Sequence, residues 1–413
     1  MRRARVQGVL PKALGVVVVV LALVVSGCGD DTDDAATTTT TVTAAPQDFS
    51  GRGPYAVGVT RLQLDTGAPV EVFYPVDRGA VPADATAYAY TPEEVWGSLV
   101  GLFPPGVLTP TEVPDAWVDA PASPSGPFPL VIFSHGWGSE RLLYSFHNAH
   151  LASWGFLVAA PEHLSRDLVA RLNDGQTTLP PNDVAVIADT VDLLAAENTQ
   201  PDGALQGRVD TDQVAVEGHS SGGRDAALAA ALPEVDTWIA LAGVPPVPDD
   251  AAAPSTTFAL REDFDLAGYL ATVTPADKPS MLIVAENDID VPPSFGPPVY
   301  DWLAPPKRYV ELADTGHFFV YDACALIQEQ GGLQATADAL GLDRSSPEIR
   351  GAENGCLPED APAADVAAVW NHLTVAQLDW VFDIDPDMAA ASLQADYLDT
   401  TFPGRINEYL VDP

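Results

Sequence analysis

The sequence predicts an α/β protein with a mostly parallel central sheet and helices on both of its faces. Short apolar segments with the composition of buried strands alternate with segments that have a helical pattern. A Gly-x-Ser-x-Gly motif also lies where one such strand meets the following helix. The predicted strands are 129–134, 155–160, 214–217, 237–242, 280–285 and 307–312. The predicted helices are 141–153, 183–198, 222–231, 295–303 and a C-terminal group from about 365 onward.

Other parts of the chain have a weaker pattern. Residues 55–64 and 69–74 alternate apolar and polar side chains, which predicts an opening antiparallel pair. The segments near 85–125 and 245–276 are rich in proline and other loop-forming residues, and we expect them to be inserted segments that partly cover the site. A short helix carrying Trp96 is expected within the first of them.

The chain is strongly acidic. Its 413 residues include 58 acidic and 19 basic side chains, for a net charge of -39. Such a surface repels nucleic acid and anionic membranes, so we expect no nucleic-acid partner. The charge is typical of an exported protein that must stay soluble.

The N-terminus predicts export. Four basic residues precede an uncharged apolar run over 13–25, which is shorter than the roughly 20 residues that cross a bilayer. The run ends in Val-Ser-Gly-Cys at 25–28, which resembles the lipobox of bacterial lipoproteins. The resemblance implies a signal peptide at 1–27 and a diacylated Cys28, which would anchor the protein to the extracytoplasmic face of the cell membrane. The alternative is a secreted protein that is cleaved elsewhere.

Two further features complete the predicted organisation. Residues 28–50 are mostly Asp, Thr, Ala and Pro, which predicts a disordered tether in front of a single domain at 51–413. With Cys28 lipidated, only Cys324 and Cys356 remain, and outside the cell they are expected to form a disulfide. Closing such a loop stabilises a protein by about 3–4 kcal/mol in the chain-entropy model.

The motif Gly218-His219-Ser220-Ser221-Gly222 predicts a nucleophilic serine. It follows the apolar segment 214–217 and precedes an alanine-rich helical segment, which is the context of a nucleophile elbow. Ser220 would project from a sharp turn. The N-terminus of the following helix, with its unpaired N–H groups, would face an oxyanion formed beside it.

The base and the acid are expected downstream. Where the nucleophile lies on such an elbow, the acid and then the histidine follow in the sequence. His317 lies in a loop after the last predicted strand, whereas His372 lies within a helical segment, so His317 is the predicted base. Asp288 follows the strand 280–285 and is the predicted acid, with Asp290 as the alternative.

An ester-cleaving serine also needs N–H donors for the oxyanion. One is predicted to be the amide of Ser221, and the other the amide of Trp137 in the glycine-containing loop 134–138. His135 precedes the serine, and we interpret it as bracing this loop. The other histidines show no carboxylate or cysteine partner at ligand spacing along the chain, so we expect no metal and no cofactor.

Three segments carry a family resemblance: FSHGWGSERLLY at 133–144, LASWGFLVAAPEH at 151–163 and GHSSGG at 218–223. They resemble the plasma-type platelet-activating-factor acetylhydrolases, within a wider group that includes chlorophyllases, dienelactone hydrolases and cutinases. The resemblance implies an α/β-hydrolase fold and hydrolysis of acyl esters without calcium. The plasma enzyme carries its acid after the strand that follows the elbow. This chain has Ala-Leu-Ala-Gly at 240–243 there, and its 285–288 segment resembles bacterial cutinases instead.

We therefore expect a serine carboxylic-ester hydrolase that acts on small-molecule or lipid esters at the cell envelope or outside the cell. The alternatives are a cutinase-like polyester hydrolase and a non-catalytic surface lipoprotein that only binds its ligand.

Overall fold

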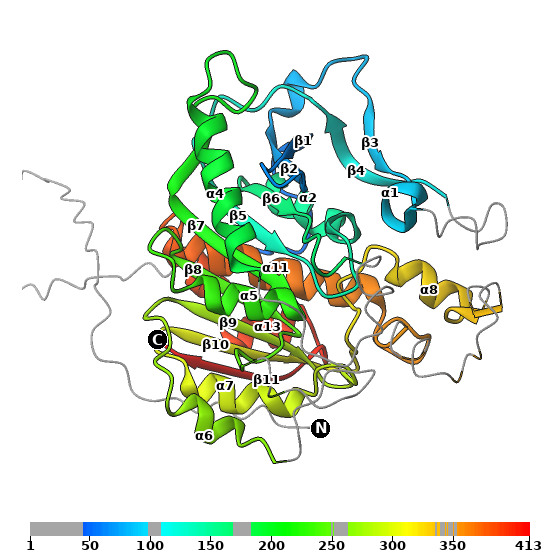
Figure 1. Cartoon of the computed structure of the whole chain (residues 1–413), viewed down its shortest axis with the longest axis vertical. Helices are drawn as coiled ribbons and strands as arrows, with labels where there is room; N and C mark the ends of the chain where they lie inside the picture. The colour runs from blue at the N-terminus through cyan, green and yellow to red at the C-terminus, as the bar shows by residue number, and fades with distance from the viewer. Residues whose placement is uncertain are drawn as a thin grey trace, which may run out of the picture.

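The computed structural model describes residues 44–97, 109–167, 183–248, 251, 263–334, 337–338, 343, 345, 350 and 353–413. Within them an 11-stranded sheet has the order β11-β10-β9-β8-β7-β5-β6-β2-β1-β4-β3 (Figure 1). The strands are β1 (Ala56–Gln63), β2 (Pro69–Val76), β3 (Ala87–Tyr90), β4 (Thr111–Val118), β5 (Phe128–Ser134), β6 (Leu157–Pro161), β7 (Val209–His219), β8 (Thr237–Leu241), β9 (Ser280–Ala285), β10 (Lys307–Leu312) and β11 (Ile406–Asp412).

The centre of the sheet is parallel. Strands β6, β5, β7, β8, β9 and β10 pair in parallel with their neighbours. The expected antiparallel pair β1–β2 joins one side of this block through β6, and β11 runs antiparallel to β10 at the other. The predicted α/β class with a mostly parallel sheet is therefore confirmed.

The uniformly apolar strands arise because both faces of the sheet are covered. In β5 every residue is buried, and successive side chains point to opposite faces. Leu130 and Ile132 pack in one hydrophobic core, while Val131 and Phe133 pack in the other. Such a strand has no polar face to display, which is why its sequence does not alternate.

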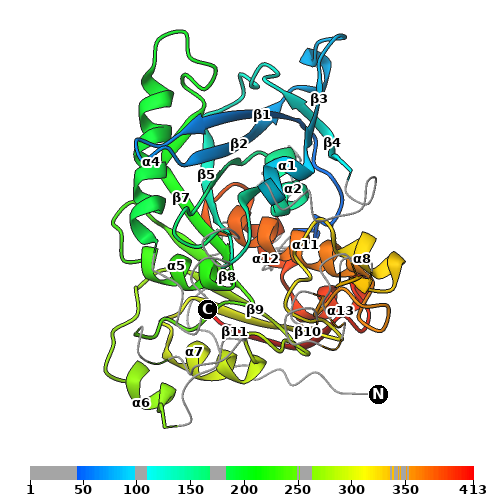
Figure 2. The ribbon, with the colours of Figure 1, turned by 45° about the vertical axis from the view of Figure 1, so that its right-hand side comes forward.

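Helices form the two outer layers (Figures 1 and 2). On one face lie α4 (Val184–Thr199), α5 (Ser221–Ala229), α6 (Leu266–Leu270) and α7 (Gly296–Trp302). On the other lie α2 (Ser145–Ser153), α11 (Ala363–Val381), α12 (Pro386–Ser392) and α13 (Ala395–Thr401). The described residues also form the helices α1 (Pro92–Trp96) and α8 (Cys324–Gln330) and the 3-10 turns η1 (Arg78–Ala80), η3 (Arg141–Tyr144) and η5 (Pro293–Phe295).

The strand order reverses its direction at β5. This strand lies between β6, which follows it in the sequence, and β7, which comes later. Ligands of open α/β sheets bind at such a switch point, beyond the carboxyl ends of the strands. Here the ends of β5 and β7 bring Ser134 next to Gly218, so the loop after β5 and the Gly-x-Ser-x-Gly motif meet.

Two parts of the sheet differ from the sequence prediction. The segment Ile406–Asp412, expected within a helical group, forms the edge strand β11. The segment expected to be cover contributes β3 and β4, which extend the other edge. Pro114 and Asp115 interrupt the apolar pattern of β4, so the sequence of this segment does not predict a strand. Such interruptions are tolerated near the edge of a sheet.

The chain enters the domain on the side where the parallel strands begin, opposite their carboxyl ends. The ring of Phe49 packs 4.9 Å from that of Trp154, which lies just before the amino end of β6. The Phe49 N–H donates to Nδ1 of His372 at 3.1 Å, and Nε2 of His150 donates to the Phe49 carbonyl oxygen at 2.9 Å. His372 is thus a buried packing residue of α11.

Cys28, the predicted signal peptide and most of the predicted tether lie outside the described residues. Within the described part of the chain, no helix is long and apolar enough to cross a membrane.

Candidate active site

Ser220 lies on a strained turn between β7 and α5. Its φ of 57° and ψ of -119° are unusual for a residue with a side chain. The turn needs glycine on both sides: a Cβ on Gly218 would lie 2.2 Å from the Gly222 oxygen, and one on Gly222 would lie 2.0 Å from the Ser134 oxygen. The Ser220 N–H donates to Leu241 of β8 at 2.9 Å, which fixes the turn to the sheet.

The predicted base and acid are in contact. Nδ1 of His317 lies 2.7 Å from Oδ2 of Asp288, and both residues are buried. The other carboxylate oxygen of Asp288 accepts the N–H groups of Asp290 at 2.8 Å and Val291 at 2.7 Å. These bonds hold the carboxylate in place and orient the imidazole, so the geometry favours Asp288 over Asp290 as the orienting acid.

His317 lies beside the elbow. Its ring centroid is 4.7 Å from that of His219, the residue before Ser220. Nε2 of His219 also donates to the carbonyl oxygen of His317 at 3.0 Å. The structure therefore brings Ser220, His317 and Asp288 into one region from three different loops.

The loop after β5 folds over the elbow. A Cβ on Gly136 would lie 3.2 Å from Cβ of Ser220 and 3.1 Å from Nδ1 of His219, so only glycine allows this close approach without a shift. Trp137 follows Gly136 in this loop, and Gly138 donates to the Arg166 carbonyl at 2.7 Å. Ser221 is the first residue of α5, where backbone N–H groups have no partner within the helix.

His219 and Tyr144 connect the loop after β5 to the loop that carries His317. The Tyr144 hydroxyl lies 2.9 Å from Nδ1 of His219 and accepts the N–H of Gly136 at 3.2 Å. Burial holds the pKa of His219 well below its usual range, so the ring is neutral. Because Nε2 faces the His317 carbonyl, it carries the proton, and Nδ1 accepts from the Tyr144 hydroxyl.

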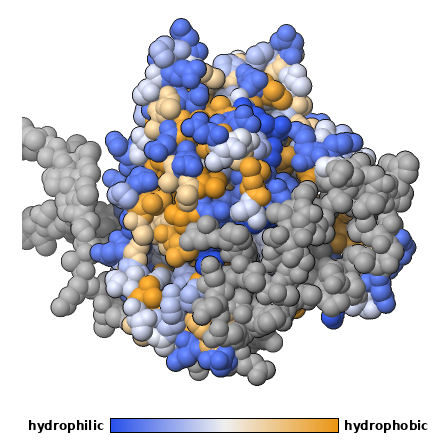
Figure 3. Space-filling model, in the orientation of Figure 1, coloured by the Kyte–Doolittle hydropathy of each residue, from blue (hydrophilic) through white to orange (hydrophobic). Residues whose placement is uncertain are grey.

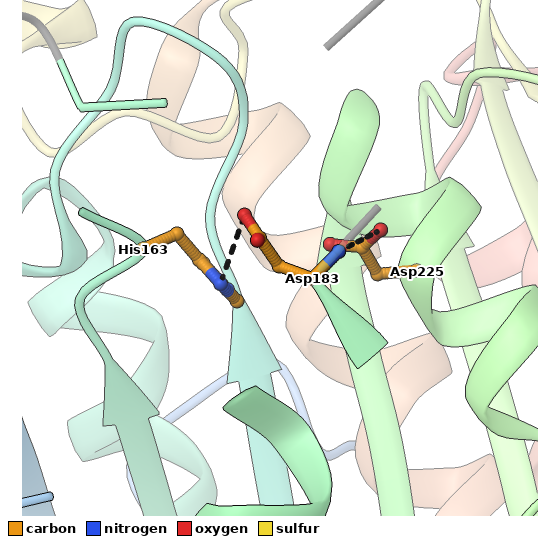
Figure 4. A group of neighbouring side chains, drawn as sticks. All are labelled: His163, Asp183 and Asp225. Carbon is orange, nitrogen blue, oxygen red and sulfur yellow. Dashed lines mark hydrogen bonds and ion pairs between the residues drawn. The ribbon is translucent and has the colours of Figure 1, made fainter. Parts of the chain in front are cut away.

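A second serine and histidine, Ser134 and His163, are in contact at the end of β5. Figure 4 shows His163 with its neighbours Asp183 and Asp225. The hydroxyl of Ser134 lies 2.9 Å from Nε2 of His163, whose Nδ1 is 3.6 Å from Asp183. Arg166 donates to the same hydroxyl at 2.8 Å and pairs with Asp225 of α5. Ser134 is fully buried, so this cluster braces the end of β5 against α5.

Among the described residues, two groups of side chains place potential metal-ligand atoms within 4.8 Å of one another: His163, Asp183 and Asp225, and Asp288, Asp290 and His317. In the first group the Arg166 guanidinium already supplies a positive charge. In the second, the Asp288–His317 contact uses two of the ligand atoms. The sequence reasoning missed the partners of His163 because Asp183 and Asp225 are close in space but distant along the chain.

Buried charges support the same loop. His135 lies 2.8 Å from Glu162, which accepts from Arg141 at 2.9 Å. Burial and the negative charge of Glu162 raise the pKa of Glu140 to about 10, so Glu140 is protonated at neutral pH. Burial opposes ionisation of Glu162, but its contacts with His135, Glu140 and Arg141 lower its pKa. One protonated and one ionised glutamate therefore lie side by side under the loop.

Cys324 and Cys356 form the predicted disulfide. The bond joins the start of α8 to the segment before α11, with a Cα–Cα distance of 4.9 Å and a sequence separation of 32 residues. Both cysteines are buried. The expectation drawn from the cysteine count is confirmed.

Apolar side chains line a hollow on the α5 and α7 side of the elbow. Its lining includes Ala227, Ala242, Val244, Leu282, Phe295 and Val299. The Val244 N–H donates to the Ser220 carbonyl at 2.9 Å, so one rim of the hollow adjoins the elbow. Figure 3 shows hydrophobic residues gathered over this part of the molecule, within a more hydrophilic rim.

Two family models match the chain. The model described as platelet-activating factor acetylhydrolase, isoform II, matches residues 42–174, and the model of the chlorophyllases matches residues 109–257. These ranges include the loop after β5 and, in the second, Ser220. Both end before Asp288 and His317.

Individual relatives agree with the first family. The platelet-activating factor acetylhydrolase of Cavia porcellus is 32% identical over 129 residues, which are 29% of each chain. That of Bos taurus is 33% identical over 130 residues, or 27% of each chain. The chain thus covers less than a third of the length of these relatives.

Proposed function

We propose that this protein is a serine hydrolase of carboxylic esters that works through an acyl-enzyme, because parts of the chain resemble the platelet-activating factor acetylhydrolases and the chlorophyllases. One observation carries the proposal: Ser220 occupies a strained strand–helix turn beside a histidine that is oriented by a buried aspartate. A serine hydroxyl is a weak nucleophile unless such a base removes its proton.

In the proposed mechanism, Ser220 attacks the carbonyl carbon of the ester while His317 accepts its proton at Nε2. Asp288 holds the proton on Nδ1 and stabilises the imidazolium that forms. The amides of Trp137 and Ser221 donate to the oxyanion. His317 then returns its proton to the leaving alcohol, and a water that it activates hydrolyses the acyl-enzyme.

The proposed substrates are esters of lipids or of small molecules with a hydrocarbon part. The matched relatives are platelet-activating factor acetylhydrolases, which supports an ester substrate with a lipid part. We further propose that diacylation of Cys28 holds the domain on the extracytoplasmic face of the cell membrane. The lipobox-like sequence at 25–28 supports this anchor.

The test is hydrolysis of p-nitrophenyl esters from acetyl to palmitoyl by the purified protein. Turnover should be lost by about 10⁴-fold or more in Ser220→Ala, with the fold unchanged. A preference for short chains supports an acetylhydrolase-like esterase, and activity on insoluble polyester supports the cutinase-like alternative. If the protein hydrolyses no ester and Ser220 is not labelled by a fluorophosphonate probe, it is a binding protein and the proposal is wrong.

A further inference from the structure

Asn354 contacts both the acid loop and the histidine loop. Its side-chain oxygen Oδ1 accepts the N–H of His317 at 2.8 Å and the N–H of Ile289 at 3.2 Å. Its side-chain Nδ2 donates to the carbonyl oxygen of Asn287 at 3.0 Å. Its own carbonyl oxygen accepts the N–H of Phe318 at 2.8 Å.

These four bonds surround the Asp288–His317 pair. Asn287 and Ile289 are the neighbours of Asp288 in the sequence, and the bonds to His317 and Phe318 fix the backbone that carries the imidazole. An amide side chain can accept and donate at once, which neither a carboxylate nor an aliphatic side chain can do. One half-buried residue therefore fixes the distance between two loops that β9 and β10 supply separately.

The disulfide holds the segment that carries Asn354. Cys356 is two residues after Asn354, and Cys324 is on the same stretch of chain as His317 and Phe318. The two backbones also touch directly, since a Cβ on Gly316 would lie 2.5 Å from the Gly355 nitrogen. The segment 353–356 thus packs against 316–318 and is fastened there by a covalent bond.

We propose that Asn354 is a positioning residue for the Asp288–His317 pair and that the Cys324–Cys356 disulfide keeps it in place. This inference rests on the proposed function, because it deepens the role of the same site. Asn354 does not touch the reacting atoms. It acts by holding His317 where its Nε2 serves Ser220, and displacement of a catalytic group by about 1 Å can cost about 100-fold in rate.

The first test compares Asn354→Ala and Asn354→Asp with the native protein. Asn354→Ala should lower kcat by about 10- to 100-fold and leave KM within about twofold, because substrate binding is unaffected. Asn354→Asp keeps both acceptor bonds but places a carboxylate beside His317. That charge stabilises the imidazolium, so the acid limb of the pH profile of kcat/KM should move to higher pH.

Asn198→Asp is the matched control. Asn198 is also half-buried and also bonds a backbone N–H and C=O, those of Val209, at 3.1 and 2.9 Å. These contacts lie at the amino end of β7, away from the elbow. This variant should leave kcat and the pH profile unchanged. An equal shift in Asn198→Asp and Asn354→Asp would show a general charge effect and overturn the proposal.

A double-mutant cycle tests the disulfide. Replacing Cys324 and Cys356 together by serine should lower kcat as Asn354→Ala does, and the triple variant should show little further loss, since all three act through one contact. Independent, multiplicative losses would overturn the link between the disulfide and Asn354. Thermal unfolding of each variant identifies any that fail to fold. If Asn354→Ala is one of them, the pH profile of Asn354→Asp tests the proposal instead.

A spectroscopic measurement separates this inference from the proposed function. The proton on Nδ1 of His317, which bonds Asp288, should give a downfield ¹H NMR signal in the native protein and in Asn198→Asp. In Asn354→Ala the signal should broaden or shift. An unchanged signal in a folded Asn354→Ala overturns the positioning role even if no ester is hydrolysed, whereas loss of the signal without any esterase activity contradicts only the proposed function.

Discussion

Tyr144 and His219 form the hydrogen bond that connects the loop after β5 to the histidine loop. The Tyr144 hydroxyl is 2.9 Å from Nδ1 of His219, and it also accepts the N–H of Gly136 at 3.2 Å. On its other side, His219 donates to the carbonyl of His317. A displacement of the phenol would therefore disturb the proposed oxyanion loop and the proposed base together.

Tyr144→Phe should lower kcat while changing KM little. The variant leaves a buried N–H of Gly136 and a buried ring nitrogen of His219 without their partner, which costs about 1–3 kcal/mol. If that cost falls on the transition state, the rate drops by about tenfold or more. Steady-state kinetics measure it. Tyr74→Phe is the control, because its equally buried hydroxyl donates to Ala120 away from the elbow at 2.8 Å. Equal losses in both variants would contradict a specific role.

Asp288→Asn should reduce kcat by about 10⁴-fold, because an amide cannot hold His317 in the tautomer that accepts a proton at Nε2. Asp290→Asn should cost far less, since Asp290 contacts the Asp288 carboxylate through its backbone N–H, which the substitution retains. Parallel kinetics of the two variants decide the assignment. A greater loss in Asp290→Asn would make Asp290 the acid.

Ser134→Ala should keep most of the activity. Ser134 resembles a nucleophile in its contact with His163, but it is fully buried and accepts from Arg166. We expect the free energy of unfolding to decrease by about 1–3 kcal/mol, because the buried side chains of His163 and Arg166 lose the hydroxyl to which they are hydrogen-bonded. Fluorophosphonate labelling should remain at one site per chain, at Ser220. Labelling that disappears in a folded Ser134→Ala would make Ser134 the reactive serine.

Glu140→Gln should stabilise the protein more as the pH rises. Burial and the charge of Glu162 raise the pKa of Glu140 to about 10, whereas in the unfolded chain this pKa has its ordinary value near 4.5. The native state therefore keeps a proton that the unfolded state releases between these values, and native stability declines as the pH rises through that window. Glutamine removes this dependence. Urea unfolding at pH 5, 7 and 9 should show a growing advantage for the variant; a constant difference would contradict the raised pKa.

Much of the fold could be predicted from local pattern. Strands β9 and β10 have the predicted bounds, because each is a short apolar run between turn-forming residues. The turn at Ser220 could be predicted because only glycine fits on both sides of it. The strand β11 could not, since its partly exposed residues lie at a sheet edge and carry no continuous apolar signal.

The supporting contacts of the site could not be predicted in the same way. Asn354, Arg166 and Asp225 meet their partners only after the chain has folded, and no spacing along the sequence pairs them. The contacts of Glu217 are an exception that the sequence does indicate. Glu217 is a charged residue within an apolar strand, and a buried charge needs a partner. The structure supplies His147 at 2.9 Å and Trp370 at 3.0 Å.

The packing of Phe49 against Trp154 determines where a membrane anchor would be joined to the domain. The chain reaches the domain at the pole where the central strands begin, and the elbow lies at the pole where they end. A lipid upstream of this entry point would be joined to the domain on the side opposite Ser220. The attachment itself would therefore leave the elbow uncovered and open to esters that arrive from the surroundings.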